Sequence, residues 1–121
     1  MKGRQALGRL GERKAARYLR RRGLRIVTRN WRCPIGEIDL IATDGDCLVF
    51  VEVRTSASGY AGGPAYTVGP HKRRKLIQLA QIWLRGARHA PDSIRFDVVA
   101  IVRRSWWRFE LDWIQGAFEQ D

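Results

Sequence analysis

The chain has few of the residues that typically build metal or redox sites from sulfur and imidazole. It contains two cysteines, Cys33 and Cys47, which are too few and too far apart for a zinc ribbon or a CxxC redox site. Its two histidines, His71 and His89, also lack the spacing typical of zinc ligands. We therefore interpret the cysteines as reduced, partly buried thiols and expect other side chains to carry the chemistry.

Long apolar runs are missing as well. No window approaches the roughly 20 apolar residues that a membrane-spanning helix needs. The N-terminal stretch MKGRQALGRLGERKAAR has no apolar segment of the kind found in secretory signal peptides. We therefore expect a soluble, cytoplasmic protein.

Acidic residues are scarce: 12 Asp and Glu stand against 23 Lys and Arg, which gives a net charge of +11. So large an imbalance causes self-repulsion that an anionic partner would relieve. Nucleic acid is the first candidate partner, and an anionic membrane is the second. The membrane is the weaker alternative, because the basic N-terminal helix lacks Trp and Phe and its apolar stripe is small. We therefore expect nucleic acid as the partner and no membrane.

The remaining pattern predicts one α/β domain, residues 1–121, since 45% of the chain is apolar. Helices are expected at about 5–22 and 70–86, and strands at 24–31, 36–42, 47–54, 93–104 and 106–111. A segment rich in Gly, Ser and Ala, 56–69, is expected to be a loop. Asp112 could cap a short closing helix, WIQGAF. The order αβββαββα predicts a mixed sheet with helices packed against it.

Three carboxylates interrupt the apolar strands: Glu37, Asp39 and Glu52. A charged carboxylate in such a run is costly to bury without a partner. Asp44-Gly45 is typical of a two-residue hairpin turn, which would set residues whose numbers sum to about 89 opposite each other. That register places Asp39 opposite Phe50 and Glu37 opposite Glu52, so all three carboxylates share one face.

The first predicted helix adds a fourth carboxylate. Glu12 lies within a narrow stripe of Gly8, Ala15 and Leu19, the stripe expected to face the sheet. Gly8 would allow this helix to approach the sheet closely. The alternative is that Glu12 pairs with a neighbouring arginine on the helix surface.

A divalent cation would remove the repulsion among these carboxylates, because Mg²⁺ prefers carboxylate oxygens. We therefore predict a site for Mg²⁺ or Mn²⁺. Its predicted ligands are Asp39, Glu52, Glu12 and Glu37. The alternative is that each carboxylate forms an ion pair with one of the 23 Lys and Arg residues.

Cations are also placed where they could serve this site. Lys72 lies one turn before Leu76 on the side of the second helix expected to be buried. Cations at a helix N-terminus oppose the helix dipole, and an anionic ligand nearby would offset that cost. For Arg73, Arg74 and Lys75 a solvated basic face is an equal alternative.

An ordered set of short motifs carries a family resemblance. It consists of GE..AA.YL near the start, then RN, GEIDLIA and VFVEVR, a Gly-rich loop, the Lys72 helix and RFDVVAI. Within this set, the Glu of the first helix followed by GEIDLIA and VFVEVR resembles the PD-(D/E)XK nucleases, which include restriction endonucleases and archaeal Holliday-junction resolvases. Nearly end to end, the chain is similar to the YraN family of small bacterial proteins. The resemblance implies a restriction-endonuclease-like, three-layer α/β/α fold with a central mixed β-sheet.

The resemblance also implies roles for individual residues. Asp39 would match the metal-binding Asp of the superfamily, and Glu52 the acidic residue of its ExK element. Glu12 would match the Glu found on the first helix in the resolvase branch. Two positions depart from the pattern: Ile38 stands where the superfamily name has Pro, and Arg54 stands where Lys is usual.

Arg54 separates two predicted functions. If the usual Lys neutralises charge at the phosphate, Arg can replace it, with a different reach. If it must exchange a proton with water, Arg cannot, because its pKa is above about 12; Lys72 could then supply the lysine. The first function is a metal-dependent endonuclease that uses Arg54 and Lys72 as catalytic residues, on DNA rather than RNA and by analogy on branched or flapped DNA.

The alternative function is a nucleic-acid-binding module that keeps the fold without catalysis. Trp31, Trp106 or Trp107 could then stack on exposed bases, although packing in the core or at an interface is the ordinary role of tryptophan. The resolvases work as dimers, so a homodimer stays open, with Trp106-Trp107 as its candidate interface.

Overall fold

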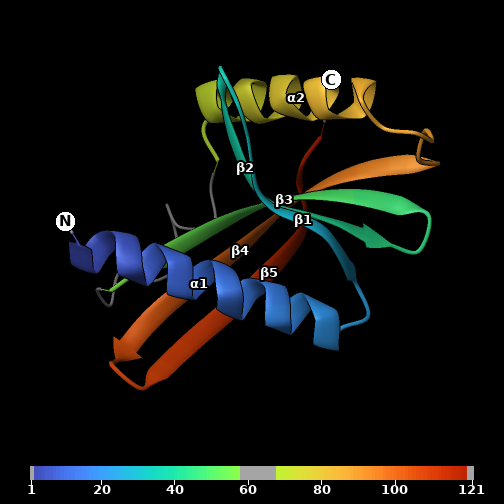
Figure 1. Ribbon diagram of the computed structural model, residues 1–121. Helices are drawn as coiled ribbons and strands as arrows, with labels where there is room; N and C mark the ends of the chain where they lie inside the picture. Colours follow the sequence, from blue (N-terminus) through green and yellow to red (C-terminus); the bar gives the residue numbers. More distant parts are fainter. Residues whose placement is uncertain (1, 58–67, 120–121) are drawn as a thin grey trace.

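The structure is a computed structural model that describes residues 2–57 and 68–119. Most of the segment predicted as a loop, 56–69, lies outside these described residues. The helices are α1 (Lys2–Arg21) and α2 (Pro70–Arg85). The strands are β1 (Arg25–Cys33), β2 (Gly36–Asp44), β3 (Cys47–Ser56), β4 (Ser93–Ser105) and β5 (Arg108–Phe118) (Figure 1).

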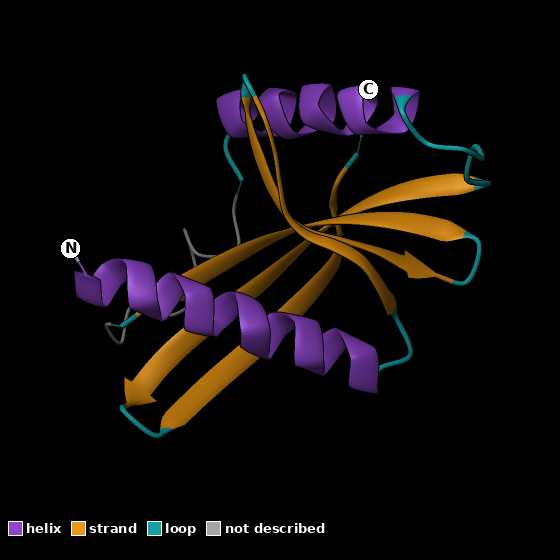
Figure 2. Cartoon of the chain, viewed as in Figure 1, coloured by secondary structure: helices purple, strands orange, loops and turns teal. Residues whose placement is uncertain are grey.

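The five strands form one sheet in the order β1-β2-β3-β4-β5. The β3–β4 pair is parallel and the other three pairs are antiparallel. Figure 2 shows the sheet strongly twisted, with α1 across one face and α2 across the other. This confirms the predicted three-layer α/β/α architecture with a central mixed sheet.

Each face of the sheet has its own apolar core because side chains alternate along the strands. On the α1 side the core includes Leu19, Leu40 and Val49. On the α2 side it includes Phe50 and Leu79. The sheet is therefore buried on both faces, and a polar group placed between the layers must find its partners there.

The hairpin between β2 and β3 differs from the predicted register. Asp44 pairs with Cys47 and Leu40 with Val51, so paired residues sum to 91 rather than 89. The turn residues are Gly45 and Asp46, and Gly45 has φ +62. Glycine thus occupies the first central position, and Asp46 avoids the positive φ that a turn centred on Asp44-Gly45 would have imposed on an aspartate.

This shift by two keeps the predicted face but changes the partners. Continued by one pair beyond Leu40, the register sets Asp39 across from Glu52 rather than from Phe50. The prediction that Glu37 lies opposite Glu52 was wrong. The parity of the turn, which decides which face a side chain occupies, was predicted correctly.

The predicted closing helix was also wrong, because β5 continues to Phe118. Trp113 pairs with Val99 and Ile114 with Val98 along the edge of the sheet. The alternating residues Phe109, Leu111 and Trp113 pack on the α1 side. This period of two continues past Asp112, so the strand pattern outweighs the capping tendency of that residue.

Within the described ranges, no helix combines the length and the apolar character needed to cross a membrane.

Candidate functional site

The acidic residues predicted from the sequence meet where β2 and β3 separate. Pairing between these strands ends at Leu40 and Val51. Just beyond that point, the backbone N–H of Val53 donates a hydrogen bond of 2.8 Å to Oδ2 of Asp39. A side chain thus replaces the next rung of the ladder, and the Asp39 carboxylate is held in the opening between the two strands.

The first helix brings Glu12 to the same place through a close approach at Gly11. A Cβ added at Gly11 would lie 3.1 Å from Cβ of Thr55 on β3 and would collide with its Oγ1. A Cβ at Gly8 would meet nothing within 4 Å. The prediction that Gly8 allows α1 to approach the sheet closely was therefore wrong, because Gly11 rather than Gly8 faces β3.

Glu12 is held by two side chains. Asn30 of β1 and Asp39 of β2 both hydrogen-bond with its carboxyl group. Asn30 has φ +52, the only positive φ outside glycine among the described residues. Sequence reasoning missed this residue, and the signal available was weak: asparagine tolerates the left-handed region better than most residues, and it stands in the RN motif.

Burial and the repulsion between neighbouring carboxylates raise the pKa of Asp39 and of Glu12. Burial is the largest cause of the raised pKa of Asp39, which reaches about 7, and the neighbouring Glu52 is the second. The Val53 N–H opposes the shift, while Glu12 and Glu37 add to it. Burial also raises the pKa of Glu12, against the hydrogen bond from Asn30. Such shifts are typical of functional sites, where like charges are held together.

Glu52 faces the cations predicted to serve the site. Its side chain is only 12% exposed, and its Oε2 lies 3.5 Å from Nζ of Lys72 on α2. The Nε of Arg54 lies 4.0 Å from the same oxygen. This Nε is buried and has no hydrogen-bond partner among the described residues. A buried donor without a partner costs about 1–3 kcal/mol, so Arg54 presents an unused donor to any acceptor that enters.

Glu37 lies at the rim of the pocket. Half of its side chain is exposed, and Oε2 lies 3.3 Å from Nε of Arg32, its partner across β1 and β2. Its charge still reaches the interior, since it contributes to the raised pKa of both Asp39 and Glu12. The structure thus brings Glu12, Asp39 and Glu52 together and sets Glu37 beside them.

The oxygen donors fit a hard divalent cation, since three carboxylates of this kind suit Mg²⁺ or Mn²⁺. In the conformation described, no three Asp, Glu, His or Cys side chains in residues 2–57 and 68–119 are grouped closely enough to ligate one ion. Glu52 is turned toward Lys72 and Arg54. Ligation by all three would therefore require a side-chain rotation, of which a glutamate is capable.

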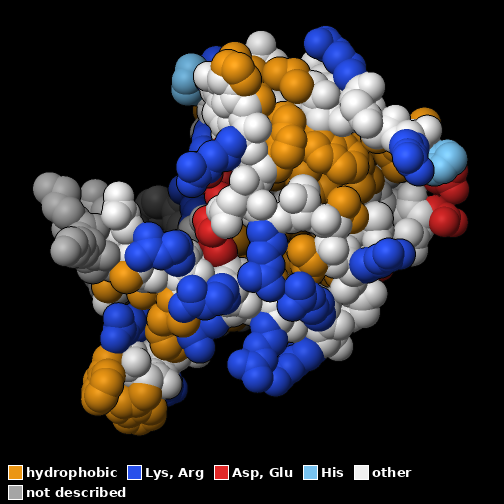
Figure 3. All heavy atoms as spheres, viewed as in Figure 1, with side chains coloured by type: hydrophobic (Ala, Val, Ile, Leu, Met, Phe, Trp, Pro, Cys, Tyr) orange, Lys and Arg blue, Asp and Glu red, His pale blue; other side chains and the backbone are white. Residues whose placement is uncertain are grey.

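Basic side chains surround the acidic pocket. Figure 3 shows a small acidic area between α1 and α2 with Lys and Arg side chains above and below it. The exposed arginines of α1 are Arg9, Arg13, Arg17, Arg20 and Arg21. A surface of this kind attracts polyanions.

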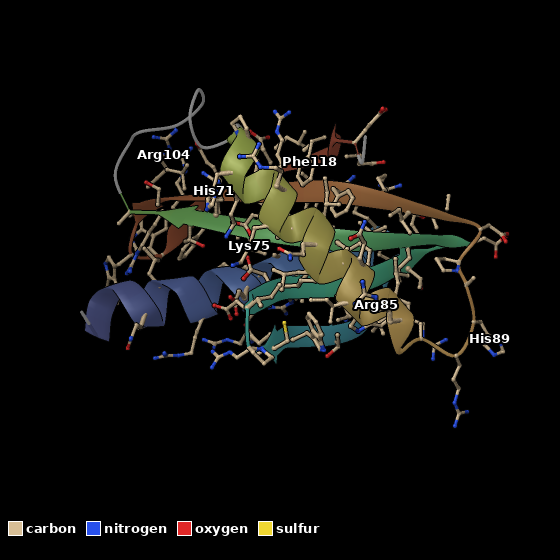
Figure 4. The ribbon with its side chains drawn as sticks, turned by 90° about the horizontal axis from the view of Figure 1, so that it is seen from above. His71, Lys75, Arg85, His89, Arg104 and Phe118 are labelled. Carbon is tan, nitrogen blue, oxygen red and sulfur yellow. The ribbon has the colours of Figure 1, made fainter. Side chains whose placement is uncertain are left out.

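Not all the cations of α2 belong to this surface. The Nε of Arg73 donates to the carbonyl oxygen of Val68 at 2.5 Å, and its guanidinium lies 5.7 Å from the ring of Phe118. The aliphatic part of Lys75 covers Gly36 at the start of β2. These two residues hold the helix in place. Figure 4 shows Lys75 and His71 on the half of α2 that lies toward the same end of the sheet as Arg104.

A cavity and a buried carboxylate lie apart from this pocket. A cavity of about 540 Å³ near the C-terminal end of α2 is lined by residues that include Val27, Leu48 and Trp83, and no predicted site residue lines it. The carboxylate of Asp97 in β4 is fully buried. It accepts hydrogen bonds from Arg95, Trp113 Nε1 and the Gly116 backbone N–H, so we assign it a structural role. Sequence reasoning had not singled out this residue.

Comparison with known proteins places these observations in a family. The model of the uncharacterised protein family UPF0102 matches residues 11–101. A UPF0102 protein of Anaeromyxobacter dehalogenans is 54% identical over 99 residues, which cover 82% of this chain and 74% of the relative. Two others are from Herminiimonas arsenicoxydans (46% identical, 96% of this chain and 89% of the relative) and Frankia alni (42% identical, 98% of each chain). This agrees with the resemblance expected from the motifs, and the names of these relatives state no activity.

Proposed function

The chain belongs to the UPF0102 family, and we propose that it is a metal-dependent endonuclease that hydrolyses phosphodiester bonds in nucleic acid. The observation that carries the proposal is the meeting of Glu12, Asp39 and Glu52 between α1 and α2, where burial and mutual repulsion raise the pKa of Asp39 to about 7. Folding places these like charges together at a cost in stability. A cation would relieve that cost, which is why we assign the pocket to metal binding.

Asp39 and Glu52, helped by Glu12, would hold Mg²⁺ or Mn²⁺, with Glu37 available at the rim. When bound, the metal would supply positive charge at the phosphoryl oxygens and lower the pKa of an attacking water. Asp39 is fixed for this role by the Val53 N–H, and Glu12 by Asn30. These restraints position the carboxylates before any ligand arrives.

Arg54 and Lys72 would act on the phosphate itself. The free Nε of Arg54 is a donor for a phosphate oxygen, and its fixed charge stabilises negative charge that develops there. Lys72, half-exposed and 3.5 Å from Glu52, is able to move a proton where Arg54 is not. Arg54 of β3 and Lys72 of α2 would thus share the role of the single Lys that the resembled nucleases carry.

The arginines of α1 would bind the backbone on either side of the cleaved bond. This binding is sequence-independent and weakens as salt displaces it. We propose DNA rather than RNA as the substrate, on the analogy with resolvases alone. The proposal also implies a cytoplasmic location, where bacterial nucleic acid is found.

A second candidate function is a binding module without catalysis. The observation that favours it is the pairing of Glu52 with Lys72 and its approach to Arg54, which together neutralise one predicted ligand in the absence of metal. In this alternative the basic surface binds nucleic acid and the carboxylates are structural.

One assay separates the two functions. Labelled linear, flapped and four-way DNA is incubated with the pure protein in Mg²⁺, Mn²⁺ or chelator. The nuclease predicts metal-dependent products that are lost in Asp39→Asn and Glu52→Gln. An Asp46→Asn variant, altered in the exposed turn between β2 and β3, serves as the matched control and should cleave normally. Intact substrate in every metal, together with DNA binding that is unchanged by chelator, would establish the binding module instead.

A further inference from the structure

The turn between β4 and β5 exposes two adjacent tryptophans. Ser105 pairs with Arg108, so Trp106 and Trp107 form the tip of the hairpin. They are 79% and 74% exposed, far more than any other large apolar side chain in the described part of the chain. Figure 3 shows apolar side chains gathered at the end of this hairpin. Exposed apolar area of this size typically marks an interaction site.

The tip is held in place before any partner binds. Arg103 donates from Nε to the carbonyl oxygen of Ser105 and from Nη2 to that of Trp106, both at 3.4 Å. Behind the turn, the ring of Phe109 lies 4.3 Å from Nζ of Lys14 on α1 and 5.8 Å from the guanidinium of Arg103. The hairpin is thus braced internally and against α1, which lowers the entropy lost when the tip binds a partner.

The charge around the tip is positive. Its flanks carry Arg103, Arg104 and Arg108, and the nearby carboxylate of Glu110 is shared between Arg104 at 2.7 Å and Arg108 at 3.8 Å. A partner that fits both the exposed tryptophans and the flanking arginines must offer flat apolar faces that alternate with negative charge. Unpaired nucleotides do so, since bases stack on tryptophan and phosphates pair with arginine. A second copy of this tip fits poorly, because two-fold contact would bring its arginines together.

The position of the tip relates it to the carboxylate pocket. The parallel strands β3 and β4 both run toward this end of the sheet, and Glu52 pairs with Val98. Trp106 lies eight residues beyond Val98 on β4. At about 3.3 Å per residue, the tip projects roughly 26 Å past the pocket. The nucleotides of one strand in a duplex are about 3.4 Å apart along the helix axis, so this distance corresponds to roughly seven or eight nucleotides.

We propose that Trp106-Trp107 is a base-stacking platform that binds unpaired nucleotides of the same nucleic acid whose backbone enters the carboxylate pocket. Stacking at the platform is independent of catalysis, whereas its link to the pocket rests on the proposed function. The substrate class is therefore a nucleic acid with a single-stranded region within about eight nucleotides of the cleaved bond.

The test measures binding in chelator, without cleavage. Fluorescence anisotropy compares a labelled 20-nucleotide oligo-dT with a 20-base-pair duplex. The double variant Trp106→Ala/Trp107→Ala should lose about tenfold or more in affinity for oligo-dT and less than about twofold for the duplex. Trp106→Phe/Trp107→Phe should keep most of the affinity, because phenylalanine also stacks. Arg104→Ala is the matched charge variant. It should weaken the binding of oligo-dT and of the duplex to the same extent and lower the salt dependence of both.

Several outcomes would overturn the platform. One is an equal loss for oligo-dT and duplex in the alanine variant, and another is no loss for either. A third is binding to vesicles containing phosphatidylglycerol that depends on the tryptophans while oligo-dT binding does not. A fourth is a dimer in sedimentation that the alanine variant converts to monomer with oligo-dT binding intact.

The platform and the nuclease can fail separately. A tryptophan-dependent preference for oligo-dT in a protein that cleaves nothing would support the platform and reject the nuclease. Cleavage that requires Asp39, with oligo-dT binding indifferent to the tryptophans, would do the reverse. Because both tryptophans are exposed, the thermal unfolding midpoint of each variant should match that of the parent chain.

Discussion

Two aspartates on the same sheet, Asp97 fully buried and Asp39 partly buried, have opposite surroundings. Asp97 in β4 is inaccessible to solvent and accepts hydrogen bonds from Arg95, Trp113 and Gly116. Asp39 in β2 has one backbone donor, from Val53, and is otherwise surrounded by carboxylates. The fold satisfies the carboxylate of Asp97 fully and that of Asp39 only in part. The surrounding donors and charges therefore distinguish the structural carboxylate of Asp97 from the candidate site carboxylate of Asp39.

The largest expected difference between the two aspartates is in catalysis. In the proposed nuclease, Asp39→Asn removes a charged metal ligand, and the cleavage rate should fall by about 10³-fold or more, which corresponds to several kcal/mol of lost transition-state stabilisation. The measurement is the rate of DNA cleavage in saturating Mg²⁺, with folding checked by circular dichroism. A rate within tenfold of the parent rate would remove Asp39 from the proposed site.

The second difference is in stability. Asp97→Asn leaves Arg95 with half of a buried ion pair, and breaking such a pair costs about 3–5 kcal/mol of unfolding free energy. Arg95 would retain its ion pair with Asp44 at 3.2 Å and its position 6.0 Å from the ring of Trp113. Denaturant unfolding of both Asn variants measures the contrast, and a comparable loss in Asp39→Asn would show that the two carboxylates are equivalent.

The pH dependence of stability tests the repulsion at Asp39 directly. Its pKa is about 7 in the folded chain and near 3.8 when unfolded, so between these values only the folded state holds the proton. Without metal, the free energy of unfolding should therefore fall as pH rises from about 4 to 7, by on the order of 2 kcal/mol. Asp39→Asn should abolish this slope, and thermal melts from pH 4 to 8 in chelator measure it. An identical slope in both proteins would place the titration elsewhere.

The smallest expected effect concerns how α1 reaches the pocket. Gly11→Ala would press a methyl group against Thr55 and lower the unfolding free energy by about 1 kcal/mol, with α1 and its Glu12 displaced from Asp39. Gly8→Ala is the matched control. Its Cβ meets nothing, so the higher helix propensity of alanine should stabilise the chain by about 0.5–1 kcal/mol. Equal effects at the two glycines would show that α1 does not approach β3 closely.

Sequence reasoning succeeded where the signal was local. Alternation along 36–42 and 47–54 and the helical stripe through Ala15 and Leu19 identified two strands and the buried face of α1, and the structure confirms them. The parity of the β2–β3 turn was predicted, although its register was off by two. The last predicted strand ended too early, at residue 111, because Asp112 suggested a helix cap. Pairing with β4 extends β5 to Phe118.

The missed residues depend on contacts between distant segments. Asn30 reaches Glu12 only because β1 passes α1, and Asp97 meets Trp113 only because β5 pairs with β4. Neither contact has a sequence spacing that could predict it. The choice between Gly8 and Gly11 depended on the rotation of α1 about its own axis, which the stripe of apolar residues defined only coarsely.

The sequence by itself determined the layered α/β architecture, the excess of positive charge and the carboxylates that share one pocket, because alternation and composition are properties of the chain that folding preserves. The tertiary structure alone decided which carboxylates are satisfied, which arginine keeps a free donor and where the two tryptophans project. Those outcomes depend on the distances between strands and helices that are far apart in the chain, and these distances are set only when all the layers pack together.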